Sequence, residues 1–170
     1  KEKKSDEQKV SIDNVLRYCK INAEKEGLRI ELGGNLVCAS GIGASAASCV
    51  AVARALNQEY LLGLNDDQIN EAAYEGEKGY HGTPSGIDNT ASTFGGLVWY
   101  VRNLEDGTSK FEKIKLNRPI HLVIAATGLT ASTKEVVGDV KIKKESDPAW
   151  FKNLSNEYNQ LVHDARKSLI

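Results

Sequence analysis

Cysteine is scarce in this sequence and shows no pattern of pairing. The three cysteines, Cys19, Cys38 and Cys49, lie far apart, and none forms a Cys-x-x-Cys pair. An odd number of isolated cysteines excludes a disulfide-stapled scaffold and a four-cysteine zinc site. The composition favours a reducing compartment, and we expect the cytoplasm. Targeting to an organelle by signals at the true termini of the protein is kept as an alternative.

Long hydrophobic runs and an excess of one charge are also lacking. No apolar run approaches the roughly 20 residues of a membrane-spanning helix, and the charged stretch 1–9 has no apolar core of a secretory signal. The 22 basic and 23 acidic side chains nearly cancel, to a net charge of −1, whereas nucleic-acid-binding domains are usually strongly basic. We therefore expect neither a membrane nor a nucleic acid as partner.

Hydrophobic periodicity predicts a mixed α+β chain of 170 residues in one or two domains. The charged stretch 1–9 is expected to be a solvated loop. Hairpins mixed with helix pairs favour α+β over a regular βαβ alternation. We place a domain boundary so that residues 1–117 and 118–170 form separate domains.

The expected helices are 11–26, 45–62, 68–78, 87–94, 132–144 and one from Pro148 towards Ile170. The expected strands are 28–32, 35–39, 97–101, 111–116 and 120–126.

A glycine-rich loop, Gly41-Ile42-Gly43-Ala44-Ser45, separates a strand-like segment from a long, alanine-rich helix. Glycines let the backbone approach a ligand closely, and the free N–H groups at a helix start attract phosphate. Ser45 is placed to cap the helix or to bind a metal ion on the phosphates. This pattern is typical of a phosphate-binding loop.

Two other interpretations of this loop have to be weighed. A plain glycine turn entering a buried helix, with Ser45 as an ordinary cap, is equally compatible with the loop alone. A Gly-x-Gly-x-x-Ala dinucleotide fingerprint would use Glu59 as its acidic residue, but a helix at 68–78 follows where a strand should. A Walker loop is excluded, because no Gly-Lys-Ser/Thr follows.

Glu77 and Asp88 flank a loop that contains His81, Pro84 and Ser85. Taken singly, Glu77 is a surface charge and Asp88 a helix cap. Taken together with the glycine loop, they supply a hard oxygen ligand for magnesium and a carboxylate that orients an acceptor hydroxyl. His81 is a weaker candidate for acid–base chemistry, and Ser85 lacks the context of a hydrolase nucleophile.

These segments resemble a known family. The glycine loop followed by Ala46-Ala47 resembles the second motif of the GHMP kinases, usually Gly-Leu-Gly-Ser-Ser-Ala-Ala. The stretches Glu75-Gly76-Glu77, His81–Asn89 and Ser92–Gly96 are similar to mevalonate kinases in particular, and Thr127–Glu135 is similar to the turn that opens their second domain. The loop that ends at Asp88 is the most specific part.

The resemblance implies a kinase that transfers phosphate from ATP, with Mg²⁺, to the primary hydroxyl of mevalonate in isoprenoid synthesis. The implied fold has an N-terminal α+β domain, like ribosomal protein S5, and the beginning of a ferredoxin-like C-terminal domain. Asp88 would be the catalytic carboxylate, and Ser45 and Glu77 the metal ligands. The triphosphate would be bound by Ala39, Ser40, Gly41, Ile42, Gly43, Ala44 and Ser45.

The sequence departs from the family pattern in several places. Ala44 replaces the first serine of the usual pair, and Val37-Cys38 stands where prolines are common. The family's N-terminal lysine segment and its third, glycine-rich motif are absent, so we expect a central fragment that is inactive by itself. Among protein partners, a second copy of the same chain, as in a homodimer, is left as an alternative. Other hypotheses are a kinase of phosphomevalonate, homoserine or a sugar, and a non-catalytic metabolite-binding relative.

Overall fold

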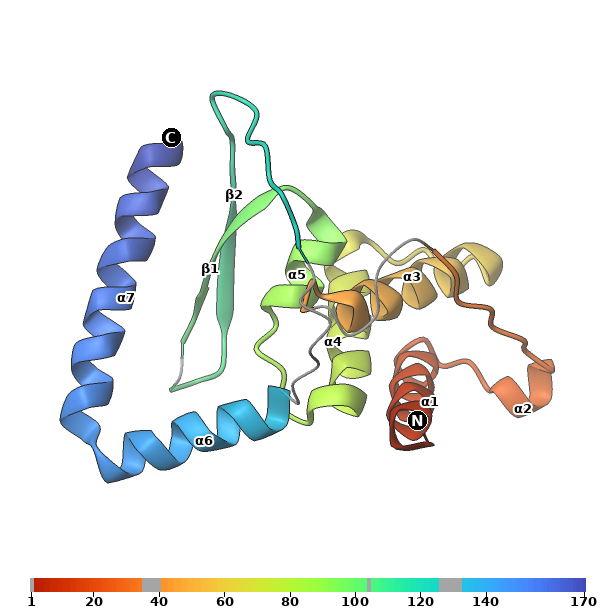
Figure 1. Ribbon diagram of the computed structural model, residues 1–170. Coiled ribbons are helices and arrows are strands. Elements are labelled where there is room, and N and C mark those ends of the chain that lie inside the picture. Colours follow the sequence, from red (N-terminus) through yellow and green to blue (C-terminus); the bar gives the residue numbers. More distant parts are fainter. Residues whose placement is uncertain (1, 35–40, 104, 126–132) are drawn as a thin grey trace. The chain divides into compact units, whose positions relative to one another are not determined.

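The computed structural model describes residues 2–34, 41–103, 105–125 and 133–170. Across these ranges it contains seven helices and a single two-stranded sheet (Figure 1). The chain divides into two compact units, 1–113 (unit 1) and 114–170 (unit 2). The mixture of helix and strand agrees with the expected α+β class. The family's domain boundary at residue 117 stays a prediction.

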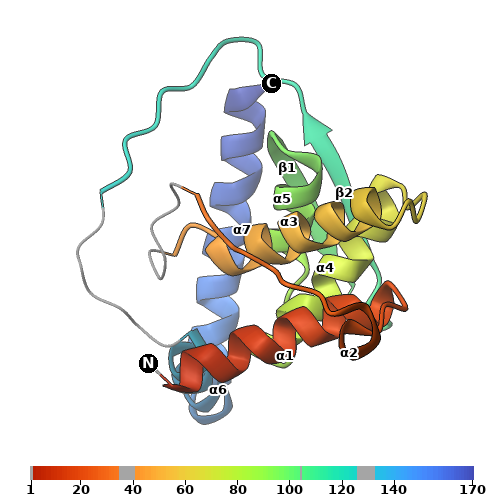
Figure 2. The same ribbon diagram turned by 90° about the vertical axis from the view of Figure 1, so that its right-hand side faces the viewer.

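Unit 1 is built on three long helices, α1 (Glu2–Tyr18), α3 (Ala44–Glu59) and α4 (Asp66–His81). Figures 1 and 2 show α4 beside both α1 and α3. Apolar residues at helical spacing on the facing surfaces close the core, as the periodicity predicted. Its buried members are Val15, Leu16, Cys19, Cys49, Val50, Val52, Ala53, Leu56, Ile69, Ala72 and Ala73.

The first helix is longer at its start and shorter at its end than expected. The prediction of a loop at 1–9 was wrong for the described residues, because α1 already begins at Glu2. Glutamate and lysine are good helix formers, so a charged first half is compatible with a helix. The expected helix to residue 26 is broken after Tyr18, where Lys20 adopts a left-handed φ of 59°, and α2 (Ala23–Glu26) follows as a separate turn.

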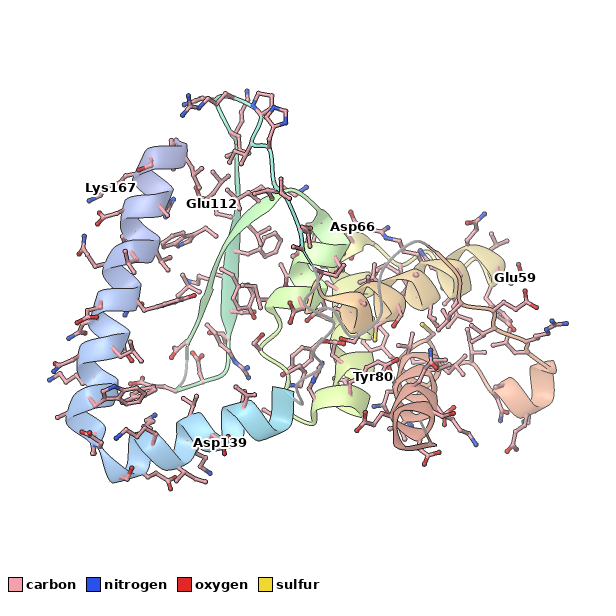
Figure 3. The ribbon with its side chains drawn as sticks, in the orientation of Figure 1. Glu59, Asp66, Tyr80, Glu112, Asp139 and Lys167 are labelled. Carbon is pink, nitrogen blue, oxygen red and sulfur yellow. The ribbon has the colours of Figure 1, made fainter. Side chains whose placement is uncertain are left out.

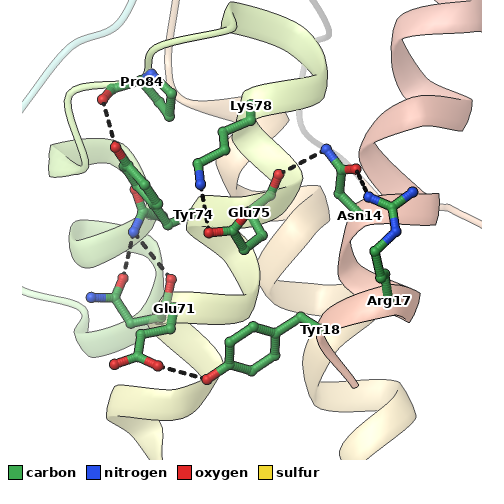
Figure 4. A network of polar contacts seen from close by, with 10 residues as sticks. Asn14, Arg17, Tyr18, Glu71, Tyr74, Glu75, Lys78 and Pro84 are labelled. Atoms are coloured by element: carbon green, nitrogen blue, oxygen red, sulfur yellow. Dashed lines mark hydrogen bonds and ion pairs between the residues drawn. The ribbon is translucent and has the colours of Figure 1, made fainter. Parts of the chain in front are cut away.

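Polar contacts along one side of α1 and α4 hold the two helices together (Figure 4). The Tyr18 hydroxyl donates to Glu71 Oε2 over 2.7 Å, and Asn14 Nδ2 donates to the Glu75 carbonyl over 3.1 Å. Burial and the neighbouring Glu71 carboxylate raise the pKa of Tyr18 to about 12. Tyr18 therefore stays protonated at neutral pH and remains a donor.

Local capping fixes where α4 begins. The Asn65 side chain accepts from the Gln68 N–H over 3.0 Å, and Gln68 Oε1 accepts from the Asn65 N–H over 3.0 Å. This reciprocal capping box satisfies two N–H groups at the helix start. The helix predicted at 68–78 is thus confirmed and extends to Asp66–His81.

The short helix predicted at 87–94 is confirmed as α5 (Ile87–Phe94), and the predicted hairpin as β1 (Leu97–Arg102) with β2 (Ser109–Ile114). The hairpin is tied to the loop before α5. Arg102 Nη1 donates to the Pro84 carbonyl over 2.9 Å, and the Tyr100 hydroxyl donates to the Ser85 carbonyl over 2.9 Å. These bonds fix the backbone that leads into α5.

Two predicted strands do not form among the described residues. The alternating segment 28–32 and the described part of the apolar run 120–126 carry no strand assignment. Leu122, Val123 and Ile124 are 80%, 96% and 72% exposed. A strand needs a neighbour for its N–H and C=O groups, and neither segment has one in the described structure. The strand predicted at 35–39 lies outside the described residues.

Unit 2 contains α6 (Thr133–Ser146) and α7 (Pro148–Leu169). Asp147 caps α7 by accepting from the Trp150 N–H over 3.1 Å, and Pro148 occupies the first turn, as predicted. No residue of α7 is buried. In the part of the chain that the structure describes, no helix has the length and apolar character required to cross a membrane.

Candidate active site

The glycine loop leads directly into the start of α3. Gly43 is the N-cap residue and has a left-handed φ of 73°, a conformation that favours glycine. No side chain of a described residue caps the helix at this point. The N–H groups of the first turn are therefore available to an anion, and the helix dipole favours negative charge there.

Glu77 places a carboxylate in the interior of unit 1, near this helix start. Glu77 is 1% exposed, so the interpretation of Glu77 as a surface charge was wrong. The Cys49 thiol donates to Glu77 Oε1 over 4.0 Å. Burial raises the pKa of Glu77, while a hydrogen bond from Ser45 and the nearby His81 oppose that rise. The carboxylate is thus held from several sides.

Ser45 joins the two helices at this point. It lies in the first turn of α3, and its Oγ is 3.4 Å from His81 Nε2. The same His81 nitrogen is 3.7 Å from Glu77 Oε2. A hydroxyl from α3 and a carboxylate and an imidazole from α4 therefore form one polar cluster.

Asp88 reaches the same place from α5. Its helix begins after Gly86, which has a left-handed φ of 88°, and within the described ranges no side chain caps this start either. A Cβ added to Gly43 would lie 3.9 Å from Asp88 Oδ1. Asp88 also raises the pKa of Glu77 by charge repulsion. The exposed Asp88 carboxylate thus lies beside the glycine loop.

The structure therefore brings together the three side chains singled out from the sequence, Ser45, Glu77 and Asp88, at the start of α3. Gly41, Ile42, Gly43 and Ala44 lie in or next to the loop, whereas Ala39 and Ser40 fall outside the described residues. The roles assigned to all of these residues remain predictions.

Sequence reasoning missed two supporting residues. Cys49 contacts Glu77, and the Ser11 hydroxyl is 3.2 Å from the Cys49 sulfur. Burial raises the pKa of Cys49 to about 11, so the thiol stays protonated at neutral pH and can donate. Helical spacing could have suggested Cys49, because it follows Ser45 by one turn on the same face of α3.

The donor set fits a magnesium ion that is shared with phosphates. Ser45 and Glu77 offer two hard oxygen ligands, and Mg²⁺ usually takes one or two protein ligands beside waters and substrate phosphates. No cluster of three or more His, Cys, Asp or Glu side chains suited to a metal occurs among the described residues.

The alternatives raised by the sequence lose support. A dinucleotide fingerprint requires its acidic residue at the end of a second strand. Glu59 instead is the last residue of the helix α3, where it is exposed (Figure 3). Ser85 Oγ accepts from the Ile87 N–H over 3.4 Å within a turn. That contact gives Ser85 a structural role in the loop before α5.

A separate cavity of about 320 Å³ lies between α1, α4 and the hairpin. Its walls include Tyr18, Glu71, Tyr74, Tyr100 and Arg102. Ser45, Glu77 and Asp88 do not line it, although Ser85, Gly86 and Asn89 flank Asp88 in sequence. The cavity is distinct from the polar cluster at the start of α3.

Comparison with known proteins identifies relatives of this chain. The family model described as the GHMP kinases N terminal domain matches residues 10–96. Mevalonate kinase of Arabidopsis thaliana is 29% identical over an alignment of 144 residues that covers 78% of this chain and 36% of that protein. Mevalonate kinase of Thermococcus sibiricus is 29% identical over 149 residues, 87% of this chain and 43% of that protein.

A solved structure gives the same result. The chain resembles the crystal structure of L. major mevalonate kinase in complex with R-mevalonate, with a TM-score of 0.81 and 43% identity. The match covers 98% of this chain and 50% of that one, so the chain spans half or less of these relatives. The family model extends over the three helices and the loop that carry the polar cluster, and the chain therefore belongs to the GHMP kinase family.

Proposed function

We propose that the full-length protein containing this chain is a mevalonate kinase, which transfers the γ-phosphoryl group of ATP to the primary hydroxyl of mevalonate. The names of the relatives and the R-mevalonate in the similar crystal structure support this acceptor. The observation that carries the proposal is the meeting of Ser45, Glu77 and Asp88 at the uncapped start of α3. We further propose that the enzyme acts in the cytoplasm.

The glycine loop and the start of α3 would bind the phosphates. Residues 39–45 would supply backbone N–H groups, and the first turn of α3, which no described side chain caps, would be left for the nucleotide. Ser45 and Glu77 would hold Mg²⁺, which neutralises charge on the phosphates when it is bound. Cys49 would keep Glu77 in place from the far side of the carboxylate.

Asp88 would orient the acceptor. Its carboxylate is exposed, lies beside Gly43 and is able to accept a hydrogen bond from the substrate hydroxyl. Positioning accounts for most of the catalysis in phosphoryl transfer, since the transition state needs little covalent help. The proximity of Asp88 to the loop would bring the hydroxyl oxygen close to the phosphate.

The proposal is tested with Asp88→Asn in the full-length protein. The amide keeps the shape of the side chain but loses its charge, so kcat should fall by roughly 10²–10⁴-fold, with melting temperature and ATP affinity little changed. Formation of ADP is measured with mevalonate, phosphomevalonate, homoserine and galactose as acceptors. Asp13→Asn on the exposed face of α1 is the matched control.

Three results would contradict this assignment. Turnover of Asp88→Asn within a few-fold of the unmodified protein would remove Asp88 from the mechanism. Saturation at low concentration by an acceptor other than mevalonate would identify a different member of the kinase family. Binding of a metabolite without any ADP formation would favour a non-catalytic relative.

A further inference from the structure

His81 occupies the end of α4, one helical turn after Glu77. Residues four apart lie on the same face of a helix, so both side chains project towards the start of α3. The helix ends here because Gly82 follows, with its N–H donating to the Lys78 carbonyl over 2.9 Å. The His81 side chain is 33% exposed, whereas that of Glu77 is 2% exposed.

One nitrogen of His81 faces two oxygen atoms from different helices. Nε2 is 3.4 Å from Ser45 Oγ and 3.7 Å from Glu77 Oε2. The other carboxylate oxygen, Oε1, is approached by the Cys49 thiol at 4.0 Å. Oε1 of Glu77 thus faces Cys49, and Oε2 faces His81. His81 also contacts Ser45.

We propose that His81 is a positioning residue that holds Ser45 and Glu77 in the geometry needed to bind the metal–nucleotide complex. The inference rests on the proposed function of this site. With a proton on Nε2, the ring donates to Ser45 Oγ over 3.4 Å, and the same nitrogen lies 3.7 Å from Glu77 Oε2, so the ring restricts the rotamers of both side chains. His81 itself contacts neither substrate nor metal in this proposal.

The expected size of the effect follows from the outer neighbours of metal ligands in general. Loss of such a partner usually weakens metal binding or activity by about 10–100-fold, because the ligands themselves lose their orientation. Ser45 is only partly buried and has freedom to turn away once Nε2 is removed. Glu77 would keep its contacts with Cys49 and Ser45 but lose the one with His81.

The experiment measures Mn²⁺ binding by electron paramagnetic resonance in the full-length protein with a non-hydrolysable ATP analogue. His81→Ala should weaken Mn²⁺ binding about 10–100-fold. His81→Gln should recover most of the affinity, because its amide nitrogen lies near the position of Nε2. Lys78→Ala is the matched control, since Lys78 lies in the same final turn but pairs with Glu75.

Steady-state kinetics separate positioning from general damage. For His81→Ala the Mg²⁺ concentration at half-maximal rate should rise, while KM for the acceptor stays within about twofold of the unmodified value. Mn²⁺ affinity unchanged in His81→Ala would overturn the proposal. Equal weakening in His81→Ala and His81→Gln would also overturn it, because the ring volume rather than the donor would then matter.

Failure of this inference is distinguishable from failure of the proposed function. An unmodified protein that phosphorylates mevalonate, together with a His81→Ala variant of normal Mn²⁺ affinity, rejects only the role of His81. An unmodified protein that binds Mn²⁺ and nucleotide but phosphorylates none of the acceptors rejects the function. Thermal melting identifies a variant that fails to fold. If His81→Ala does not fold, the Mn²⁺ affinity of His81→Gln alone tests the role of His81.

Discussion

Glu77 carries a carboxylate into a region where water is nearly excluded. Its exposed fraction is 1%, and burial is the largest cause of its raised pKa, while Ser45 and His81 act in the opposite direction. A buried charge costs free energy unless donors compensate it. Burial of this carboxylate therefore lowers the stability of unit 1 wherever its donors do not compensate the charge.

The first prediction concerns the pH dependence of stability. The pKa of Glu77 in the folded chain lies above its ordinary value of 4.5, so the folded state binds this proton more tightly than the unfolded state. The free energy of unfolding should therefore fall as pH rises from 4.5 through the raised pKa. Denaturant titrations across this range should give a shallower decline for Glu77→Gln than for the unmodified chain.

At pH 7 the same substitution should raise the free energy of unfolding by about 1 kcal/mol, the usual scale of a point substitution, because an amide is cheaper to bury than a charge. Glu59→Gln, at the exposed end of α3, serves as the control and should change nothing measurable. An identical pH slope for Glu77→Gln and the unmodified chain would show that Glu77 is not the group responsible.

At the scale of elements, α4 depends on close approach to its neighbours. A Cβ added to Gly79 would lie 2.5 Å from the Ser11 nitrogen and 2.6 Å from its Cα, which are backbone atoms of α1. Backbone atoms cannot turn aside as a side chain can. The missing side chain of Gly79 therefore sets the separation between α1 and α4.

The second prediction compares two Gly→Ala substitutions in helices. Gly79→Ala should destabilise unit 1 by roughly 1–3 kcal/mol, the usual cost of overpacking, because α1 must move away. Gly138→Ala in α6 meets no atom within 4 Å and should instead stabilise its helix by about 0.5–1 kcal/mol. Thermal melting followed by circular dichroism compares the two. A neutral or stabilising Gly79→Ala would contradict the close packing of α1 and α4.

At the scale of the whole molecule, burial is distributed unevenly between the two units. In unit 1, Val15, Ala53 and Ala72 are completely buried. In unit 2, α7 has no buried residue, and its Tyr158 and Leu161 are 67% and 69% exposed. Helical stability in proteins comes chiefly from packing of an apolar face, so the two units should differ in local stability.

The third prediction follows for hydrogen exchange of this chain. Amides in the middle of α4 should exchange only on global opening of unit 1, whereas those of α7 should exchange at least roughly 100-fold faster through local opening. Mass spectrometry of peptic peptides measures both in one sample. Equal protection of α7 and α4 would mean that α7 is packed more tightly than its exposure indicates.

Much of the local structure follows from short-range patterns. The capping pair Asn65 and Gln68, the helical period of α3 and α4, and Pro148 at the start of α7 are readable from sequence because each depends on neighbours within a few residues. The segments 28–32 and 120–125 show the opposite case. Their patterns are those of strands, yet a strand exists only when another strand supplies its hydrogen bonds.

The amino-acid sequence by itself determined the helices after residue 40, the hairpin, the glycine loop and the identity of Ser45, Glu77 and Asp88 as candidates, but not the bounds of α1. Only the tertiary structure decided that these side chains meet, that Glu77 is buried, and that His81 and Cys49 lie around it. The physical reason is that periodicity fixes which face a residue occupies on its own helix. Which faces come together depends on packing between helices that are distant in the chain.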